Sequence, residues 1–275
     1  KTYAEEGLLT RASELQSYFA SALHSLGDAP NVIVAVVDTG ILANHPDLAG
    51  QLVAGYDFII DTAVSVDGNG RDADASDPGD AYQGQPSSWH GTHVAGTVGV
   101  GNTNNGVGVA GINWSVKLQA VRVLGKCGGY DSDIQAAMLW AGGIEATPST
   151  NPNPAKVINM SLGGRGSCLQ SYRTAISQLA ARGTLVVASV GNEGSVVVSP
   201  ANCPGVVGVA GIRHVGTKVG FSNLGPGVAL GAPGGNCVNI GPGEPCLYSI
   251  DTTTNLGTQS PTASGYTDQF RFNVG

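Results

Sequence analysis

The sequence predicts an α/β protein built on a doubly wound, mostly parallel β-sheet with helices on both faces. Short runs of Val, Ala and Ile alternate along the chain with segments whose apolar residues recur at helical spacing. Within each run the apolar residues are consecutive, which is typical of strands buried on both faces of a parallel sheet. The 42 glycines lie between the runs without a fixed period, as expected for many tight turns.

The first expected elements occupy the N-terminal part of the chain. Residues 11–26 carry apolar side chains at helical spacing, which predicts an amphipathic helix leading into the core. An uninterrupted apolar run over 32–37 predicts a buried strand that ends at Asp38. The segment 90–99 is apolar at helical spacing and predicts the next helix.

The middle of the chain repeats this alternation. Further strands are expected at 156–161, 185–189 and 206–210, and helices at 133–142 and 171–182. Strands that alternate with helices indicate βαβ units. From about residue 215 the pattern loosens into Gly, Pro, Asn, Ser and Thr. Because no repeat or linker divides the chain, we expect residues 1–275 to form a single domain.

The charge balance excludes several kinds of partner. The formal net charge is −7 with only 13 Lys and Arg, so we expect no nucleic-acid partner, and a cation is the favoured ionic ligand. No apolar stretch approaches the length of a membrane span, so we expect no membrane association. Residues 1–10 lack the layout of a signal peptide, so a secreted protein would already have lost that segment.

Five cysteines lie in loop-like surroundings, and none forms a Cys-x-x-Cys pair or neighbours a histidine at metal-binding spacing. Disulfides in an oxidising compartment are therefore the favoured interpretation over structural thiols. The odd number leaves one cysteine unpaired within this chain. The cysteines are Cys127, Cys168, Cys203, Cys237 and Cys246.

Three polar residues stand at the ends of expected elements. Asp38 ends the first strand, His90 opens a helix, and Asn192 follows the strand at 185–189. Each alone is more often a turn or cap residue. In open α/β sheets, however, ligands bind beyond the carboxyl ends of the strands. A carboxylate, an imidazole and a carboxamide gathered there would provide an orienting acid, a general base and an oxyanion donor for acyl transfer.

Four longer sequence motifs support this interpretation, because together they resemble a known family. They are Val-Val-Asp-Thr-Gly-Ile at 36–41, His-Gly-Thr-His-Val-Ala-Gly-Thr at 90–97, Asn-Met-Ser-Leu-Gly-Gly at 159–164 and Gly-Asn-Glu-Gly at 191–194. In this order they resemble the signature blocks of the subtilases, and the likeness extends over about 30–275. The order Asp then His is also that of the subtilisin catalytic triad.

The resemblance implies a secreted serine endopeptidase and gives roles to individual residues. His90 would be the base, Asp38 would orient it, and Asn192 would donate to the oxyanion. A strand of four residues would pair with extended polypeptide substrate and form one wall of the specificity pocket. Two glycines in it leave room for large apolar or aromatic residues before the cleaved bond. The four are Ser161, Leu162, Gly163 and Gly164.

The nucleophile is expected outside this chain. Subtilases carry it in a Gly-Thr-Ser block that opens a buried helix, and residues 270–275 resemble the approach to that block. We therefore expect an associated C-terminal segment after Gly275 to supply the serine. Ser260 is not a candidate, because Pro261 directly after it disrupts a helix start.

Two other functions compete with this interpretation. A catalytically inactive peptide-binding fragment, or pseudoprotease, could hold extended chains by strand addition; the missing serine favours it, but a binder has no need of Asp38, His90 and Asn192 together. An unrelated α/β hydrolase would need a Gly-x-Ser-x-Gly motif, which is missing from the sequence. His93 follows His90 by three residues but lacks the His-Glu-x-x-His pattern, so a packed structural histidine is expected.

Calcium is the expected cofactor. Six aspartates stand between 61 and 80, with Arg71 as the only base, on Gly-rich polypeptide that suits all-oxygen coordination. The candidate ligands there are Asp61, Asp67, Asp72 and Asp74. The resemblance implies a second site, formed by the side chains of Asp47 and Asn105 and the carbonyls of Val107 and Val109.

The resemblance to secreted subtilases with extra cysteines also implies a disulfide pairing. Cys127 would pair with Cys168, and Cys203 would pair with either Cys237 or Cys246.

Overall fold

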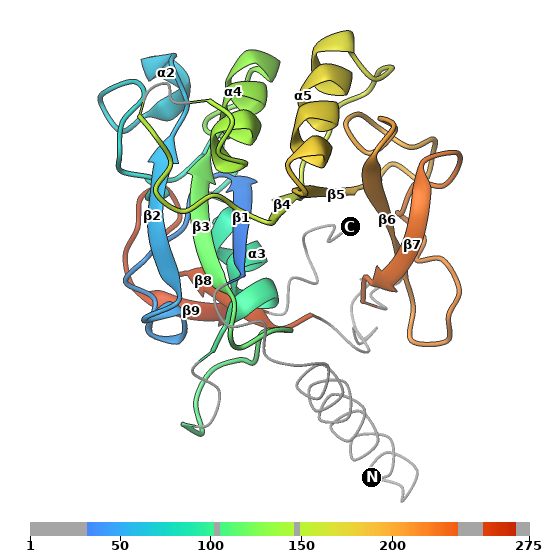
Figure 1. Ribbon diagram of the computed structural model, residues 1–275. Helices are drawn as coiled ribbons and strands as arrows, with labels where there is room; N and C mark the ends of the chain where they lie inside the picture. The colour runs from blue at the N-terminus through green and yellow to red at the C-terminus, as the bar shows by residue number, and fades with distance from the viewer. Residues whose placement is uncertain (1–31, 102–104, 146–148, 236–249, 268–275) are drawn as a thin grey trace, which may run out of the picture.

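The computed structural model describes residues 32–101, 105–145, 149–235 and 250–267. The helix predicted at 11–26 lies outside these ranges. The described residues form a parallel seven-stranded sheet in the order β2-β3-β1-β4-β5-β6-β7 (Figure 1). Its strands are β1 (Ile33–Asp38), β2 (Leu52–Asp57), β3 (Lys117–Arg122), β4 (Val157–Met160), β5 (Leu185–Ser189), β6 (Val206–Ile212) and β7 (Val228–Pro233).

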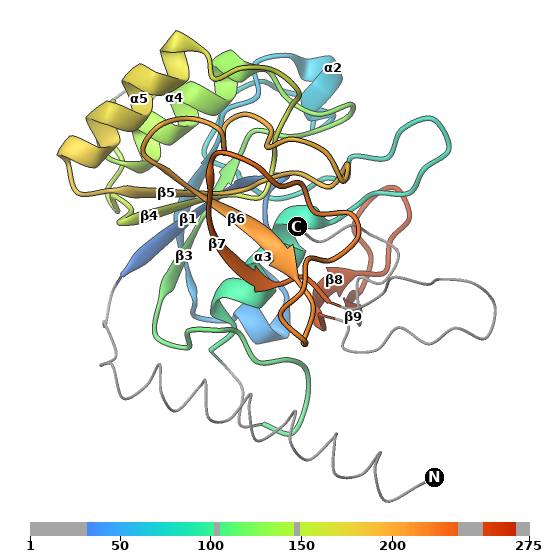
Figure 2. The same cartoon turned by 90° about the vertical axis from the view of Figure 1, so that its right-hand side faces the viewer.

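Helices cover both faces of the sheet. The helices α4 (Asp131–Ala141) and α5 (Gln170–Ala181) lie on one face, and α3 (His90–Gly99) lies on the other (Figures 1 and 2). A hairpin of β8 (Thr252–Asn255) and β9 (Ser264–Thr267) lies beside α3 (Figure 2). Two short elements, η1 (Pro46–Leu48) and α2 (Thr62–Ser65), flank β2 in sequence.

The strand β1 shows why the first apolar run is uninterrupted. Ala35 and Val37 belong to the core under α4 and α5, whereas Val34 and Val36 belong to the core under α3. Successive side chains of a strand point to opposite faces, so burial on both faces requires an apolar residue at every position. The predicted doubly wound α/β fold is confirmed, and so are its four predicted strands and the three predicted helices after residue 32.

The strands β2, β3 and β7 and the hairpin were not predicted. The strand β3 buries polar side chains among its apolar ones, so its sequence lacks the continuous apolar run by which the other strands were predicted. Gln119 is buried and donates to the carbonyl oxygen of Ala54 and to Asn151 Oδ1, both at 2.9 Å. Such partners offset the cost of burying a polar group, but they are not visible in the local sequence.

The helix α3 is held closely against β8. A Cβ atom at Gly96 would lie 2.2 Å from Thr253 Oγ1, so this contact requires glycine. His93 is buried, with Nε2 2.8 Å from Thr254 Oγ1. Burial, with a smaller contribution from His90, lowers the pKa of His93 to about 3. His93 is therefore a neutral packing residue, as predicted.

The disulfide prediction was wrong. Cys168 pairs with Cys203 across a Cα–Cα distance of 5.1 Å, and Cys127 is an exposed free thiol. Cys168 and Cys203 are both buried in the core around α5, which brings them together although 35 residues separate them. Cys237 and Cys246 lie outside the described residues.

Removing this disulfide is expected to destabilise the fold. Closing a loop of 35 residues is worth about 3–4 kcal/mol, mainly by restricting the unfolded chain. The double variant C168A/C203A should therefore melt at a lower temperature than the parent, while C127A should melt as the parent does. A melting temperature that reducing agent leaves unchanged in the parent would contradict the pairing.

Candidate active site

Asp38 and His90 meet at the carboxyl edge of the sheet. The strand β1 ends at Asp38, and α3 begins at His90 after Trp89, whose left-handed backbone (φ +55°) turns the chain into the helix. His90 Nδ1 lies 2.8 Å from Asp38 Oδ1 and 3.0 Å from Asp38 Oδ2. Asp38 is fully buried, whereas the His90 side chain is 30% exposed. With Nδ1 directed at the carboxylate, Nε2 is the ring atom that can accept a proton from a hydroxyl.

The electrostatics of the pair favour a charged imidazole. Burial lowers the pKa of His90, but the charge and hydrogen bond of Asp38, together with the charges of Asp80 and Asp77, raise it above its ordinary value. A base that becomes an imidazolium during acyl transfer is helped by such an environment, because the carboxylate stabilises the positive charge as it forms.

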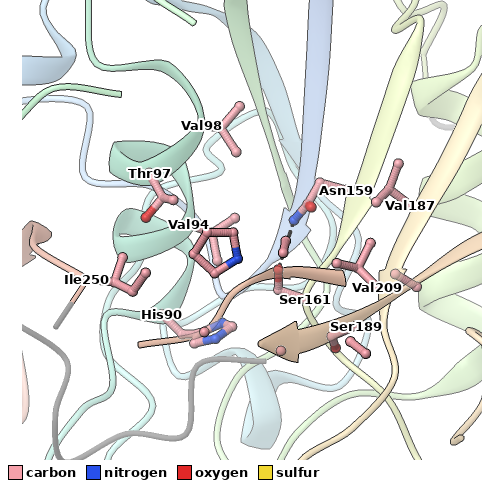
Figure 3. A pocket seen from close by; sticks show the side chains of 16 residues that line it. His90, Val94, Thr97, Val98, Asn159, Ser161, Val187, Ser189, Val209 and Ile250 are labelled. Carbon is pink, nitrogen blue, oxygen red and sulfur yellow. Dashed lines mark hydrogen bonds between the residues drawn. The ribbon is translucent and has the colours of Figure 1, made fainter. Parts of the chain in front are cut away.

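A pocket of about 260 Å³ opens beside His90. Val94 and Val98 of α3 lie on one side of it, and Val187 and Val209 lie on the other (Figure 3). The pocket therefore lies between α3 and the ends of β4 to β7. Its remaining lining residues are Thr97, Asn159, Ser161, Ala188, Ser189, Ala210, Gly211, Ala232, Pro233, Gly234 and Ile250.

The predicted substrate strand follows β4 and begins in this pocket. The Ser161 hydroxyl accepts a hydrogen bond from Asn159 Nδ2 at 3.0 Å (Figure 3). A Cβ atom at Gly163 would lie 2.7 Å from Val198 Cγ2, whereas one at Gly164 would meet no atom within 4 Å. Space is therefore open at Gly164 but already occupied by Val198 at Gly163. Leu162 packs, partly buried, against the core.

Asn192 lies in the turn after β5, next to the strand that leads to Ser161. A fully buried residue, Asn223, orders this turn. Its Nδ2 donates to the carbonyl oxygen of Val190 at 3.0 Å, and its Oδ1 accepts from the amides of Glu193 at 3.1 Å and Ser195 at 2.7 Å. Sequence reasoning missed Asn223, because an asparagine in a Gly- and Ser-rich segment gives no local sign of these distant partners.

Part of the second expected calcium site comes together, because Asp47 lies against the loop at 105–109. Asp47 Oδ2 accepts from the amide of Val109 at 2.9 Å, and Asn105 Oδ1 accepts from the amide of Val107 at 3.0 Å. A Cβ atom at Gly108 would lie 2.1 Å from Asp47 Oδ2, so the loop at 105–109 passes directly over this buried carboxylate. One carboxylate, one amide oxygen and main-chain carbonyls form the kind of donor set that suits Ca²⁺.

The acidic loop at 61–80 is arranged differently. Its carboxylates serve local turns: Asp61 accepts from the amide of Ala63, Asp72 from that of Asp74, and Asp74 from that of Ser76. Within the described parts of the chain, no three His, Cys, Asp or Glu side chains form a group that could hold a metal. Calcium binding by Asp61, Asp67, Asp72 and Asp74 stays a prediction.

Arginine side chains meet part of this negative charge. Arg122 of β3 lies 2.7 Å from Asp67 of the loop, whereas Arg71 within the loop pairs at 2.9 Å with Asp133 of α4. The prediction of a cation at the loop rested on Arg71 as the only base nearby. Arg122 is distant in sequence, so its neutralising charge was not visible there.

Comparison with known proteins identifies the family. The model of the subtilase family matches residues 29–270. The chain belongs to the subtilase family. This subtilase is 48% identical over 246 residues to an extracellular protease of Xanthomonas campestris pv. campestris, and 42% identical over 254 residues to an extracellular basic protease of Dichelobacter nodosus. The matches cover 85% of this chain in both cases but only 40% and 42% of the two relatives.

A solved structure supports the same assignment. The subtilase resembles a protease from Pseudoalteromonas arctica PAMC 21717 with a TM-score of 0.80 and 44% sequence identity, over 86% of this chain and 71% of that one. In the ranges that the structure describes, none of the helices is both long and apolar enough to cross a membrane.

Proposed function

We propose that residues 1–275 belong to one peptidase domain of a secreted serine endopeptidase that hydrolyses peptide bonds in polypeptides. The observation that carries the proposal is the contact of 2.8 Å between buried Asp38 and His90, beside a pocket at the carboxyl edge of the sheet. Family membership supports the reaction class, and the two relatives named as extracellular proteases support secretion.

In the proposed reaction, a serine hydroxyl attacks the carbonyl carbon of the scissile bond while His90 Nε2 takes its proton. Asp38 holds the imidazole in the required tautomer and stabilises the imidazolium. Asn192 donates its side-chain amide to the oxyanion. In a subtilisin, removing one such donor costs about 10²–10³ in kcat, or roughly 3–4 kcal/mol. The imidazolium then protonates the leaving amine, and water releases the acyl group by the same steps.

The proposed nucleophile is a serine in a segment that follows Gly275. The pocket beside His90 supports this, because valines from α3 and from the sheet line it and could receive an apolar helix that begins at the serine (Figure 3). A substrate strand along 161–164 would place its side chain before the cleaved bond near Gly164, where space is open. Val198 already occupies the space beside Gly163. The open space at Gly164 supports a preference for large apolar side chains at the substrate position before the cleaved bond.

Peptidyl phosphonates, which modify the nucleophile of serine proteases, test these points together. The enzyme would be treated, as its producing cell releases it, with three phosphonates that carry Phe, Asp or Arg at the position before the reactive group. Peptide mapping would then locate the adduct, with a His90→Ala variant as the unlabelled control. We expect the Phe reagent to react fastest and the adduct to lie on a serine beyond Gly275.

The other outcomes are equally informative. An adduct on Ser161, Ser189 or Ser260 would overturn the assignment of the nucleophile. Faster reaction of the Asp or Arg reagent would overturn the proposed preference. A parent protein that is not labelled at all would favour the peptide-binding function over hydrolysis.

Calcium is proposed at the site formed by Asp47 and the loop at 105–109. An ion that binds only the folded state stabilises it by mass action, by about 2.7 kcal/mol at a free concentration 100 times Kd. A chelator should therefore lower the melting temperature of the parent, and added Ca²⁺ should restore it. An Asp47→Asn variant should respond much less. No change in the parent would contradict the proposal, and an equal response in Asp47→Asn would exclude this site.

A further inference from the structure

Thr39 lies between the two groups of the Asp38–His90 pair. Its amide donates to Asp38 Oδ1 at 2.8 Å, and its hydroxyl accepts from the amide of Gly91 at 3.0 Å. Gly91 directly follows His90 in α3, so one residue holds both the carboxylate and the first turn of the helix that carries the imidazole. A change in the position of Thr39 would therefore alter the contact between Asp38 and His90.

Thr39 is itself anchored from the opposite side. Its hydroxyl donates to Asp77 Oδ2 at 2.6 Å, and the amide of Gly79 donates to Asp77 Oδ1 at 2.8 Å. Thr39 is 3% exposed and Asp77 is 1% exposed. A threonine hydroxyl has a single proton. Because Asp77 takes this proton, the hydroxyl oxygen is left to accept from Gly91, and its orientation is determined.

The backbone around these groups is closely packed. A Cβ atom at Gly91 would lie 2.1 Å from the carbonyl oxygen of Gly40, and one at Gly40 (φ +104°) would lie 2.7 Å from the carbonyl oxygen of Ala75. The end of β1, the start of α3 and the segment that carries Asp77 are thus in direct contact. Arg122 adds a hydrogen bond from Nε to the carbonyl oxygen of Thr39 at 3.2 Å.

We propose that Thr39, anchored by the carboxylate of Asp77, is a positioning residue that sets the geometry between Asp38 and the His90 imidazole. This inference rests on the proposed function, because it concerns the same catalytic pair. Thr39 acts through Asp38 and Gly91, so it should influence the chemical step more than substrate binding, which is assigned to 161–164.

The pKa of the Asp77 carboxyl group makes the contact between Asp77 and Thr39 sensitive to pH. Burial raises the pKa of Asp77 to about 7, Asp80 adds to the rise, and hydrogen bonds from Thr39 and Gly79, with the charge of Arg122, oppose it. The negative charge of Asp77 also contributes to the raised pKa of His90, together with Asp38 and Asp80. The carboxylate that orients Thr39 therefore titrates near neutral pH.

Two substitutions at Thr39 in the full-length enzyme test the proposal. Thr39→Val keeps the shape but removes the hydroxyl, so the amide of Gly91 and Asp77 Oδ2 both lose their partner. We expect kcat to fall about 10- to 100-fold with KM nearly unchanged, because small displacements of catalytic groups cost this much. Thr39→Ser retains the hydroxyl and should retain most of the parent kcat.

A spectroscopic readout makes the test independent of hydrolysis. The proton NMR signal of His90 Nδ1–H reports its hydrogen bond to Asp38 and needs no nucleophile. The signal should shift or broaden in Thr39→Val and remain close to its parent position in Thr39→Ser. If the parent fails to hydrolyse peptides, the proposed function fails, but this signal still decides whether Thr39 positions the pair.

Several results would overturn the proposal. These are a parent-like kcat and a parent-like His90 signal in Thr39→Val, equal impairment of the valine and serine variants, or a change in KM with kcat unaffected. If Thr39→Val does not fold, Asp77→Asn serves instead, since it replaces one acceptor oxygen with an amide donor while keeping the size. A parent-like kcat and His90 signal in Asp77→Asn would then overturn the proposal.

Discussion

Replacing Asp38 with asparagine is expected to lower the kcat of this subtilase about 10⁴-fold. Asp38 is fully buried and accepts from His90 Nδ1 at 2.8 Å. An asparagine in its place can present an amide donor to that nitrogen, which favours the wrong imidazole tautomer and no longer stabilises the imidazolium. Hydrolysis of a chromogenic peptide, followed over a range of substrate concentrations, measures the loss.

The pH profile provides a second measurement of the same variant. Asp38 is the main contribution that raises the pKa of His90. Without the carboxylate the imidazolium is less stable, so the acid limb of kcat/KM should move to lower pH. Glu145→Gln, an exposed carboxyl group just after α4, is the matched control and should match the parent. An acid limb that does not move, or a kcat within tenfold of the parent, would contradict the assigned role.

Replacing Arg122 with methionine is expected to lower the free energy of unfolding by about 3–5 kcal/mol, because it leaves a buried charge without its partner. Arg122 is buried and forms ion pairs with Asp57, which is fully buried, and with Asp67 at 2.7 Å. Its guanidinium also donates to the carbonyl oxygen of Ser65. Methionine would fill the space but could satisfy none of these acceptors. Chemical denaturation of parent and variant measures the difference.

The destabilisation should depend on pH. Burial raises the pKa of Asp57 to about 6, although the charge of Arg122 opposes the shift. Removing Arg122 should raise this pKa further. A carboxyl group whose pKa is raised on folding weakens the folded state when ionised, so the deficit should be largest above the folded pKa. It should narrow as pH falls toward about 6, the folded pKa of Asp57 in the parent, because below that value the group is protonated in both folded proteins.

A second substitution distinguishes whether R122M loses stability through the unpaired charge or through poorer packing. The double variant D57N/R122M removes the unpaired carboxylate and should regain part of the lost stability at pH 8. A pH-independent deficit, or a double variant no more stable than R122M, would show that the loss comes from packing instead.

The sequence by itself determined the fold class and pointed to Asp38 and His90 as the proposed catalytic pair. Burial on both faces leaves a local mark, the runs of consecutive apolar residues in β1, β5 and β6 and around Asn159 in β4. Asp38 and His90 could be recognised because Asp38 ends such a strand, His90 opens a helix, and each stands within a long family string. The carboxyl ends of parallel strands share one edge of a sheet, so the order of the elements was enough to predict that these side chains meet.

Only the tertiary structure decided which distant residues become partners. It joined Cys168 to Cys203 instead of Cys127, and it brought Arg122 to Asp57 and Asp67. It also placed Asp77 against the hydroxyl of Thr39, 38 residues away in the chain. Such pairs depend on how helices and strands pack. A buried polar group needs a partner of the right geometry, but its local sequence does not specify where along the chain that partner comes from.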